Sequence, residues 1–254
     1  MKQGKVYFVS DVHLGSRYHS DPMEVERRFA RWLLSIEPDA AALYLVGDIF
    51  DYWFEYKHVV PRGHTRFLGA LATLSDAGVE IHFFTGNHDI WLKDYLTREA
   101  HVIIHREPYE MTLNGTTFFI AHGDEFDYRK RSFRLLRRIF HNRLCQTLYG
   151  SIHPRWTVGL AHSWSLSSRR KGLKSGVPDY QGEAEEYLVR FAKSELARRS
   201  TPIHYFIFGH RHILLDLMLT RESRIIILGD WLRYDSYAVW DGAQMELHSL
   251  REGE

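Results

Sequence analysis

Residues 6–13 read VYFVSDVH, a short apolar run that ends at two polar side chains, Asp11 and His13. Runs rich in β-branched and aromatic residues are typical of buried strands. The pattern recurs where the apolar runs 42–46, 81–85, 117–121 and 205–208 lead into the motifs GDIFD (47–51), GNHD (86–89), AHGD (121–124) and GHRH (209–212). The sequence therefore predicts five buried strands, each followed by polar residues.

Helical patterns lie between these strands. Asp21-Pro22 supplies a helix N-cap and a proline at the first helical position, followed by apolar residues on one face. A second pattern over residues 67–74 stops at Gly78, and residues 183–199 form a third. Strands that alternate with helices indicate a layered α/β fold.

The C-terminal part has a different pattern. After residue 224 it contains three strand-like runs, 225–228, 237–240 and 245–250, with a turn signal at Asp241-Gly242. These runs predict a β meander that completes a second sheet. With 254 residues, of which 44% are hydrophobic, the chain can bury one large core, so we expect a single domain over residues 1–254.

The polar residues after the strands are of types that bind metals. Ligands in open α/β sheets collect at the carboxyl ends of strands, so these side chains are expected to converge. Carboxylate, amide and imidazole donors suit Mn²⁺, Fe²⁺ or Zn²⁺ better than Ca²⁺, and the absence of thiolates disfavours a structural zinc site. The predicted ligands are Asp11, His13, Asp48, Asn87, His122, His210 and His212.

Each motif alone is a weak signal. The chain has 16 histidines, most of which are expected at the surface or in the core, and Asp48 in GDIFD could simply cap a helix. The order of five such motifs, each closing an apolar run, favours function.

That order of motifs, over residues 11–212, resembles the calcineurin-like metallophosphoesterase superfamily. The resemblance implies a four-layer α/β/β/α sandwich with a dinuclear metal centre. It implies one metal on Asp11, His13, Asp48 and His212, and a second on Asp48, Asn87, His122 and His210, with Asp48 as the bridge. It also implies that His88 stabilises charge on the scissile phosphate or protonates the leaving oxygen, and that Asp89 orients His88.

Simple metal chemistry leads to the same reaction. Two cations roughly 3.5–4 Å apart lower the pKa of a water between them towards about 7 and hold phosphate oxygens for in-line attack. No protein nucleophile is needed. Asp48 is the expected bridge, because a carboxylate can share its oxygens between two cations whereas an imidazole cannot.

Further details resemble the family of UDP-2,3-diacylglucosamine diphosphatases. They are SDVHLG (10–15), LVGDIFD (45–51) followed by Tyr52-Trp53, and LGDW (228–231). The resemblance implies hydrolysis of this acylated nucleotide sugar to UMP and 2,3-diacylglucosamine 1-phosphate in lipid A biosynthesis, by metal-activated hydroxide. In the best-known branch of that family an arginine occupies the position of His88, so this chain resembles a histidine-type branch, in which the substrate can differ.

An insert is expected between the fourth and fifth motifs. His122 and His210 are 88 positions apart, whereas the preceding intervals between motif residues are 37, 39 and 35. Residues 127–182 hold twelve Lys or Arg and two acidic residues, a charge of +10, which leaves 21 basic and 30 acidic residues elsewhere. This segment is predicted to be a basic helical lid beside the metal centre, and it implies an anionic partner.

The first part of this insert has an amphipathic pattern. Helical spacing over residues 130–149 aligns Phe133, Leu136, Phe140, Leu144 and Leu148, with arginines on the remaining surface. Two interpretations are equally favoured by the pattern alone: packing on the core, or contact with acyl chains or an anionic bilayer. Phe133 and Phe140 are candidate substrate contacts, as are the basic residues Arg169, Arg170 and Lys171, although such a run is more often a solvated surface.

Three classes of function remain open. They are the lipid-precursor diphosphatase, a soluble nucleotide or phosphodiester hydrolase, and a non-catalytic scaffold. The intact ligand set disfavours the scaffold, and nucleic acid is not an expected partner because no binding motif is present and the rest of the chain is acidic. No run approaches the roughly 18 apolar residues of a membrane span, so we expect a cytoplasmic protein, peripheral at the inner face of the inner membrane.

Overall fold

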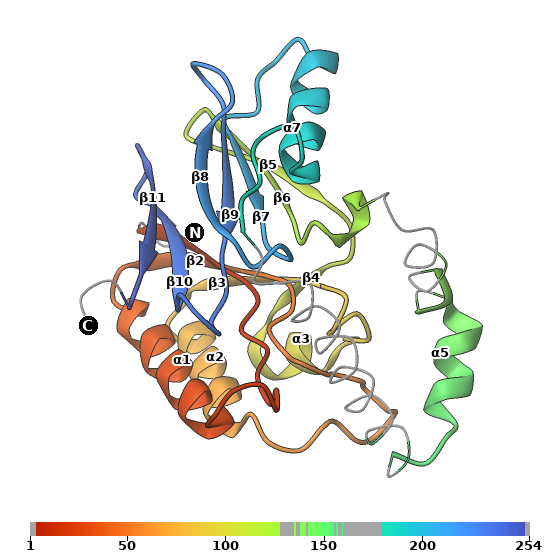
Figure 1. Cartoon of the computed structure of the whole chain (residues 1–254). Helices are drawn as coiled ribbons and strands as arrows, with labels where there is room; N and C mark the ends of the chain where they lie inside the picture. Colours follow the sequence, from red (N-terminus) through yellow and green to blue (C-terminus); the bar gives the residue numbers. More distant parts are fainter. Residues whose placement is uncertain are drawn as a thin grey trace.

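A six-stranded sheet forms one half of the computed structural model, which describes residues 4–127, 135, 138–140, 142–154, 156, 159 and 179–251. Its strands are β1 (Lys5–Val9), β2 (Ala40–Val46), β3 (Glu80–Phe84), β4 (Ile103–His105), β10 (Ser236–Trp240) and β11 (Met245–Ser249). They lie in the order β11-β10-β1-β2-β3-β4, with β1 to β4 parallel (Figure 1). The predicted strands at the first three motifs are confirmed.

A five-stranded sheet forms the other half. Its strands are β5 (Tyr109–Leu113), β6 (Thr116–Ala121), β7 (Tyr205–Phe208), β8 (Leu214–Met218) and β9 (Arg224–Leu228). They lie in the order β5-β6-β7-β9-β8, and β6, β7 and β9 are parallel to one another. The predicted strands before AHGD and GHRH are therefore confirmed as neighbours in this sheet.

The prediction of a C-terminal meander in the second sheet is wrong. β9 belongs to the second sheet, but β10 pairs antiparallel with β1 and carries β11 onto the edge of the first sheet. The reason lies in the free edge of β1, whose backbone groups need a partner. Ala238 and Trp240 of β10 are buried between the two sheets, which stabilises this pairing.

Helices cover the outer faces of both sheets, so the layers follow the predicted α/β/β/α order (Figure 1). On the first sheet lie α1 (Pro22–Ile36), α2 (Thr65–Asp76) and α3 (Tyr95–Ala100), and on the second lies α7 (Tyr187–Arg198). The side chain of Asp21 accepts hydrogen bonds from the backbone N–H groups of Met23 and Glu24, as expected of an N-cap. A short 3₁₀ helix, η1, spans Asp124–Phe126.

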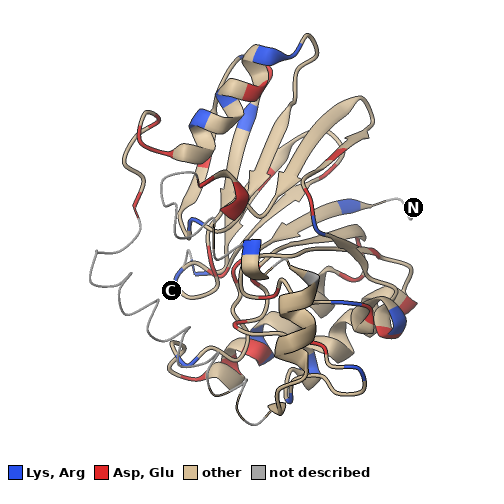
Figure 2. Ribbon diagram, turned by 90° about the vertical axis from the view of Figure 1, so that its right-hand side faces the viewer, with Lys and Arg blue, Asp and Glu red and all other residues tan. Residues whose placement is uncertain are grey.

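The interior consists of apolar layers on either side of each sheet. Between the sheets pack Phe8, Phe118 and Trp240, whereas Phe29 and Trp231 pack beneath the helices of the first sheet. The strands of both sheets carry few charged residues, and most charges lie on helices and loops (Figure 2). Within the described residues, no helix combines the length and apolar character that a membrane span requires.

The predicted insert is described only in part. Helix α5 (Arg143–Gly150) begins after Asn142, whose backbone is extended and whose side chain accepts hydrogen bonds from the N–H groups of Leu144 and Cys145. One continuous helix over residues 130–149 is therefore a wrong prediction, because Asn142 caps a new helix. In Figure 1, α5 stands to one side of the sheets. Phe133, Leu136, Arg169, Arg170 and Lys171 lie outside the described residues.

Candidate metal centre

The motif residues lie just beyond the carboxyl ends of the parallel strands. Asp11 and His13 follow β1, and Asp48 and Asn87 follow β2 and β3 in the first sheet. His122 follows β6, whereas His210 and His212 follow β7, so the second sheet supplies the remaining three. Six of these seven side chains form two groups of three, and within each group the potential ligand atoms lie within 4.8 Å of one another.

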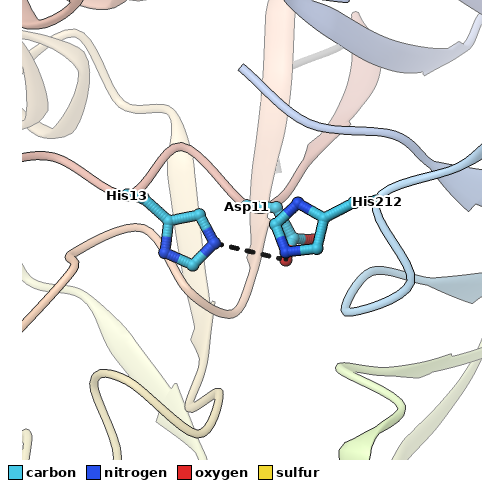
Figure 3. Close-up of side chains that lie close together, drawn as sticks. All are labelled: Asp11, His13 and His212. Carbon is cyan, nitrogen blue, oxygen red and sulfur yellow. Dashed lines mark ion pairs between the residues drawn. The ribbon is translucent and has the colours of Figure 1, made fainter. Parts of the chain in front are cut away.

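The first group consists of Asp11, His13 and His212. The Nε2 atoms of His13 and His212 lie 3.7 Å and 3.5 Å from the same oxygen, Oδ1 of Asp11. Figure 3 shows the His13 ring directed at the Asp11 carboxylate, which lies beside the ring of His212. Two imidazole nitrogens and one carboxylate oxygen thus face a common point.

The second group consists of Asp48, His122 and His210. Nε2 of His122 lies 3.5 Å from Oδ2 of Asp48, and the centroids of the two imidazole rings are 5.1 Å apart. The same Asp48 oxygen is 3.9 Å from Nε2 of His13 in the first group. Asp48 therefore lies between the two groups, as expected of a bridge.

Several polar atoms of the predicted ligands lack hydrogen bonds. In the part of the chain that the structure describes, Oδ1 of Asp11, Oδ1 of Asn87 and Nε2 of His122 are buried and have no hydrogen-bond partner. A buried polar atom without a partner costs about 1–3 kcal/mol. Divalent cations bound here would supply the missing partners, and the oxygen and nitrogen donors suit such ions. The residues thus fit a divalent metal site.

Asp48 and His122 stabilise each other's charges in the second group. Burial opposes ionisation, but the attraction between the partners lowers the pKa of Asp48 well below its usual value and raises the pKa of His122 well above it. Burial and the proximity of His122 lower the pKa of His210 to about 4. The ring of His210 is therefore neutral at pH 7, the form that binds a cation, whereas His122 must release a proton when a cation binds.

The backbone at the predicted ligands is strained. Nine non-glycine residues of the described chain have positive φ, and five of them are Asp11, His13, Asp48, His210 and His212, with φ between 50° and 64°. Such left-handed conformations cost about 1–3 kcal/mol each and are concentrated at functional sites. Hydrogen bonds between the loops hold them in place, including those from the N–H groups of Asp11 and His13 to the carbonyls of Gly47 and Asp48.

Three glycines leave room for the ligands. Gly47, Gly86 and Gly209 each precede a predicted ligand, and a Cβ atom at any of them would collide with a ligand supplied by another strand. At Gly209, for example, it would lie 2.6 Å from Oδ2 of Asp11. The glycine in the GD, GN and GH motifs is thus required by the close approach of the neighbouring loop.

His88 lies at the rim of the centre. Its side chain is 19% exposed, whereas that of His13 is fully buried, and the two rings meet edge to face at 4.9 Å. Nδ1 of His88 donates a hydrogen bond to the backbone carbonyl of Asp51, at 2.8 Å. The Asp51 carboxylate also lies 3.9 Å from Nδ1 of His88 and 3.8 Å from Nδ1 of His13.

The orienting role of Asp89 remains a prediction, and the hydrogen bond of the His88 ring itself goes to the carbonyl of Asp51. The carboxylate of Asp89 instead accepts hydrogen bonds from the N–H groups of Gly86, Ile49 and Phe50. Burial and the nearby Asp48 raise the pKa of Asp89 to about 7. Asp89 thus connects the loops after β2 and β3. Asp51 was missed by the sequence analysis although GDIFD contains it.

Aromatic side chains connect the described part of the insert to these same loops. The ring of Tyr149 in α5 lies 4.9 Å from the rings of both Phe54 and Trp91, and its hydroxyl is 3.2 Å from that of Tyr52. The candidate Phe140 packs against Trp91, whose Nε1 donates a hydrogen bond to the Phe140 carbonyl. These contacts anchor the insert to residues that follow the GDIFD and GNHD motifs by one to three positions.

The two-sheet sandwich, with Asp and His side chains clustered at its strand ends, is the arrangement expected of a metal-dependent hydrolase. The family model of the calcineurin-like phosphoesterases matches residues 4–214, and the chain belongs to this family. A UDP-2,3-diacylglucosamine hydrolase of Porphyromonas gingivalis is 54% identical, with 99% of this chain and 100% of the relative covered. Hydrolases of the same name from Edwardsiella ictaluri and Serratia proteamaculans are 34% and 27% identical, over 81% and 88% of this chain and 74% and 90% of their own lengths.

Gly86→Ala tests the steric requirement at the centre. The added methyl group would overlap the carboxylate and backbone of Asp48, so we expect hydrolysis of a chromogenic phosphodiester to fall by at least about tenfold, with weaker Mn²⁺ binding by calorimetry. Gly69→Ala is the matched control, because that glycine lies in α2 with open space around its Cβ position. It should keep full activity and change stability by less than about 1 kcal/mol. Equal activities of the two variants would contradict this interpretation.

Proposed function

We propose that this chain hydrolyses the diphosphate of UDP-2,3-diacylglucosamine, producing UMP and 2,3-diacylglucosamine 1-phosphate in lipid A biosynthesis. The main support is the Porphyromonas gingivalis relative, which is 54% identical and is matched over its whole length, insert included. A metallophosphoesterase family fold with a fitting metal site supplies the chemistry that this reaction needs.

The proposed cofactor is a pair of divalent cations, with Mn²⁺ as the first choice and Fe²⁺ or Zn²⁺ as alternatives. Asp11, His13 and His212 would hold one cation, Asn87, His122 and His210 the other, and Asp48 would contact both. When bound, such a pair activates water for attack on phosphorus and neutralises charge on the phosphate oxygens. The supporting observation is the position of Asp48 between the two ligand groups.

His88 is proposed as the catalytic residue that touches the leaving group. Since its Nδ1 donates to the Asp51 carbonyl, Nε2 is the nitrogen that can exchange a proton with substrate. Its partly exposed position at the rim suits contact with a bound phosphate. Asp51 and Asp89 are proposed as positioning residues, the first for His88 and the second for the two loops after β2 and β3.

The substrate is proposed to make further contacts with the insert. Its charge of +10 complements an anionic nucleotide sugar, and its apolar residues complement acyl chains. Phe133 and Phe140 remain proposed acyl contacts, and Arg169, Arg170 and Lys171 remain proposed phosphate contacts.

An exposed apolar stripe on the insert supports contact with a membrane. Leu144 is 67% exposed, Leu148 60%, Ile152 42% and Trp156 67%, and they recur every four residues. The Leu144 and Leu148 side chains are therefore not packed in the core, which was one of the two interpretations of this pattern. Because the insert is basic as well as apolar here, we propose that the stripe contacts the anionic cytoplasmic surface of the inner membrane, where an acylated substrate resides.

The reaction is tested directly with purified protein, Mn²⁺ and UDP-2,3-diacylglucosamine in ¹⁸O-labelled water. We expect UMP as a product, carrying one ¹⁸O atom, because attack on the α-phosphorus places the new oxygen on UMP. Mass spectrometry of both products measures this. Label found only in the sugar phosphate rejects attack at that phosphorus. Hydrolysis of a small phosphodiester without any release of UMP would instead favour a soluble substrate.

His88→Ala tests the proton donor. We expect kcat to fall by about 10²–10⁴-fold, the usual contribution of one positioned acid, while bound metal measured by elemental analysis stays as in the unmodified protein. His58→Ala is the control, because His58 is an exposed histidine in a loop. If His88→Ala loses metal in parallel with its activity, the residue supports the metal site and is not a proton donor.

Leu144→Asp combined with Leu148→Asp tests the stripe. Burying one leucine contributes about 1.5–3 kcal/mol, so losing two should reduce binding to phosphatidylglycerol vesicles by at least about tenfold and raise KM for the diacylated substrate. Hydrolysis of a chromogenic diester should stay unchanged. Leu34→Asp, at a 46% exposed leucine of α1, is the matched control. Unchanged vesicle binding with a changed oligomeric state would identify the stripe as a protein interface and contradict the proposal.

A further inference from the structure

The loop after β9 contacts the first ligand group at two places. Oδ2 of Asp230 lies 3.1 Å from Nδ1 of His212, and the backbone N–H of Trp231 donates a hydrogen bond to the carbonyl of Asp11 at 3.1 Å. Asp230 is fully buried. This loop carries the LGDW motif (228–231), to which no part of the proposed reaction assigns a task.

Asp230 is held firmly as an ionised acceptor. Its other oxygen, Oδ1, accepts hydrogen bonds from the backbone N–H groups of Leu232 and Arg233, at 3.1 Å and 2.7 Å. The Arg233 guanidinium lies 3.5 Å from Oδ2 and supplies a positive charge. Donors surround the carboxylate, so it can only accept a hydrogen bond from His212.

The position of the loop is fixed by the core. The indole of Trp231 is fully buried and lies 4.7 Å from the ring of Phe29 and 5.6 Å from that of Trp32, both in α1. Its Nε1 donates a hydrogen bond to the carbonyl of Ser236 at the start of β10. The packing of Trp231 therefore fixes the backbone that carries the Asp230 carboxylate.

This contact determines the tautomer of His212. Because Asp230 accepts, Nδ1 of His212 carries the hydrogen, and its Nε2 keeps a free electron pair directed towards Asp11, 3.5 Å away. The two ring nitrogens lie on different sides of the imidazole, so a cation on Nε2 is out of reach of Asp230. Asp230 thus acts on a ligand and is not itself one.

We infer that Asp230 is a positioning residue that strengthens His212 as a ligand in the site of Asp11, His13 and His212. The inference rests on the proposed two-cation centre. In the other site, His122 donates its Nδ1 hydrogen to the neutral carbonyl of Val46, at 2.9 Å. A carboxylate partner makes the opposite ring nitrogen a better donor than a carbonyl partner does, and such partners contribute about 10–100-fold to metal affinity.

The experiment is a Mn²⁺ titration of metal-free Asp230→Asn by calorimetry. The amide cannot accept from His212 and from both backbone N–H groups at once, so we expect one of the two binding events to weaken by about 10–100-fold while the other is unchanged. Asp235→Asn is the matched control. Asp235 is a buried acid of the same loop that pairs with Arg28 and Arg251, away from the metal residues. This variant should lose stability and keep the unmodified titration curve.

A second measurement needs no variant. Nitrogen-15 NMR of the unmodified, metal-free protein, recorded at a pH where the His212 ring is neutral, should show the ring hydrogen on Nδ1. A neutral ring with its hydrogen on Nε2 overturns the inference even if Asp230→Asn fails to fold. Wild-type affinity for both cations in Asp230→Asn also overturns it, and so does equal weakening of both binding events in Asp230→Asn and Asp235→Asn.

If the unmodified protein binds one cation, and Asp230→Asn weakens it, the two-cation proposal fails and the positioning role stands. If it binds none, both fail.

Discussion

The structure depends on the burial of polar atoms that have no hydrogen-bond partner within the described part of the chain. Oδ1 of Asp11, Oδ1 of Asn87 and Nε2 of His122 belong to residues that follow strands of both sheets at their carboxyl ends. Such burial is unfavourable for the polypeptide alone, because desolvation is not repaid by a hydrogen bond. The surrounding loops keep these atoms in place through backbone hydrogen bonds, three glycines and the Asp89 carboxylate. The apolar clusters on the two faces of the first sheet stabilise the fold and offset the cost of burying these polar atoms.

Much of the fold and of the ligand set could be predicted from the sequence, because buried strands have continuous apolar runs and their polar ends are visible in the chain. Strands β4, β5 and β8 were not predicted. They are edge strands of the two sheets, and their half-exposed residues give no continuous apolar run. The sheet to which β10 belongs could not be predicted either, since a strand pattern does not state which free edge the strand will pair with.

The roles of three aspartates, Asp51, Asp89 and Asp230, could not be predicted from the sequence either. GDIFD, GNHD and LGDW each contain an aspartate whose task depends on its hydrogen bonds, and spacing along the chain does not reveal their partners. Asp51 holds His88 through its carbonyl, Asp89 holds backbone amides, and Asp230 holds His212. The candidate contacts to a metal or a phosphate could be predicted from the sequence. The residues that support them through hydrogen bonds could be identified only from the structure.

The hydrogen bond from the His210 N–H to Oδ2 of Asp11 joins residues separated by 199 positions along the chain. Closing so long a loop is entropically costly, and contacts of this kind form late in folding. During synthesis the N-terminal ligands emerge first, but the strand that carries His210 must follow before they can be enclosed. A nascent chain therefore spends much of its synthesis with five of the seven predicted ligands and the β1 edge uncovered. The free edge of β1 is therefore most open to pairing with other chains before the last fifth of this chain has been synthesised.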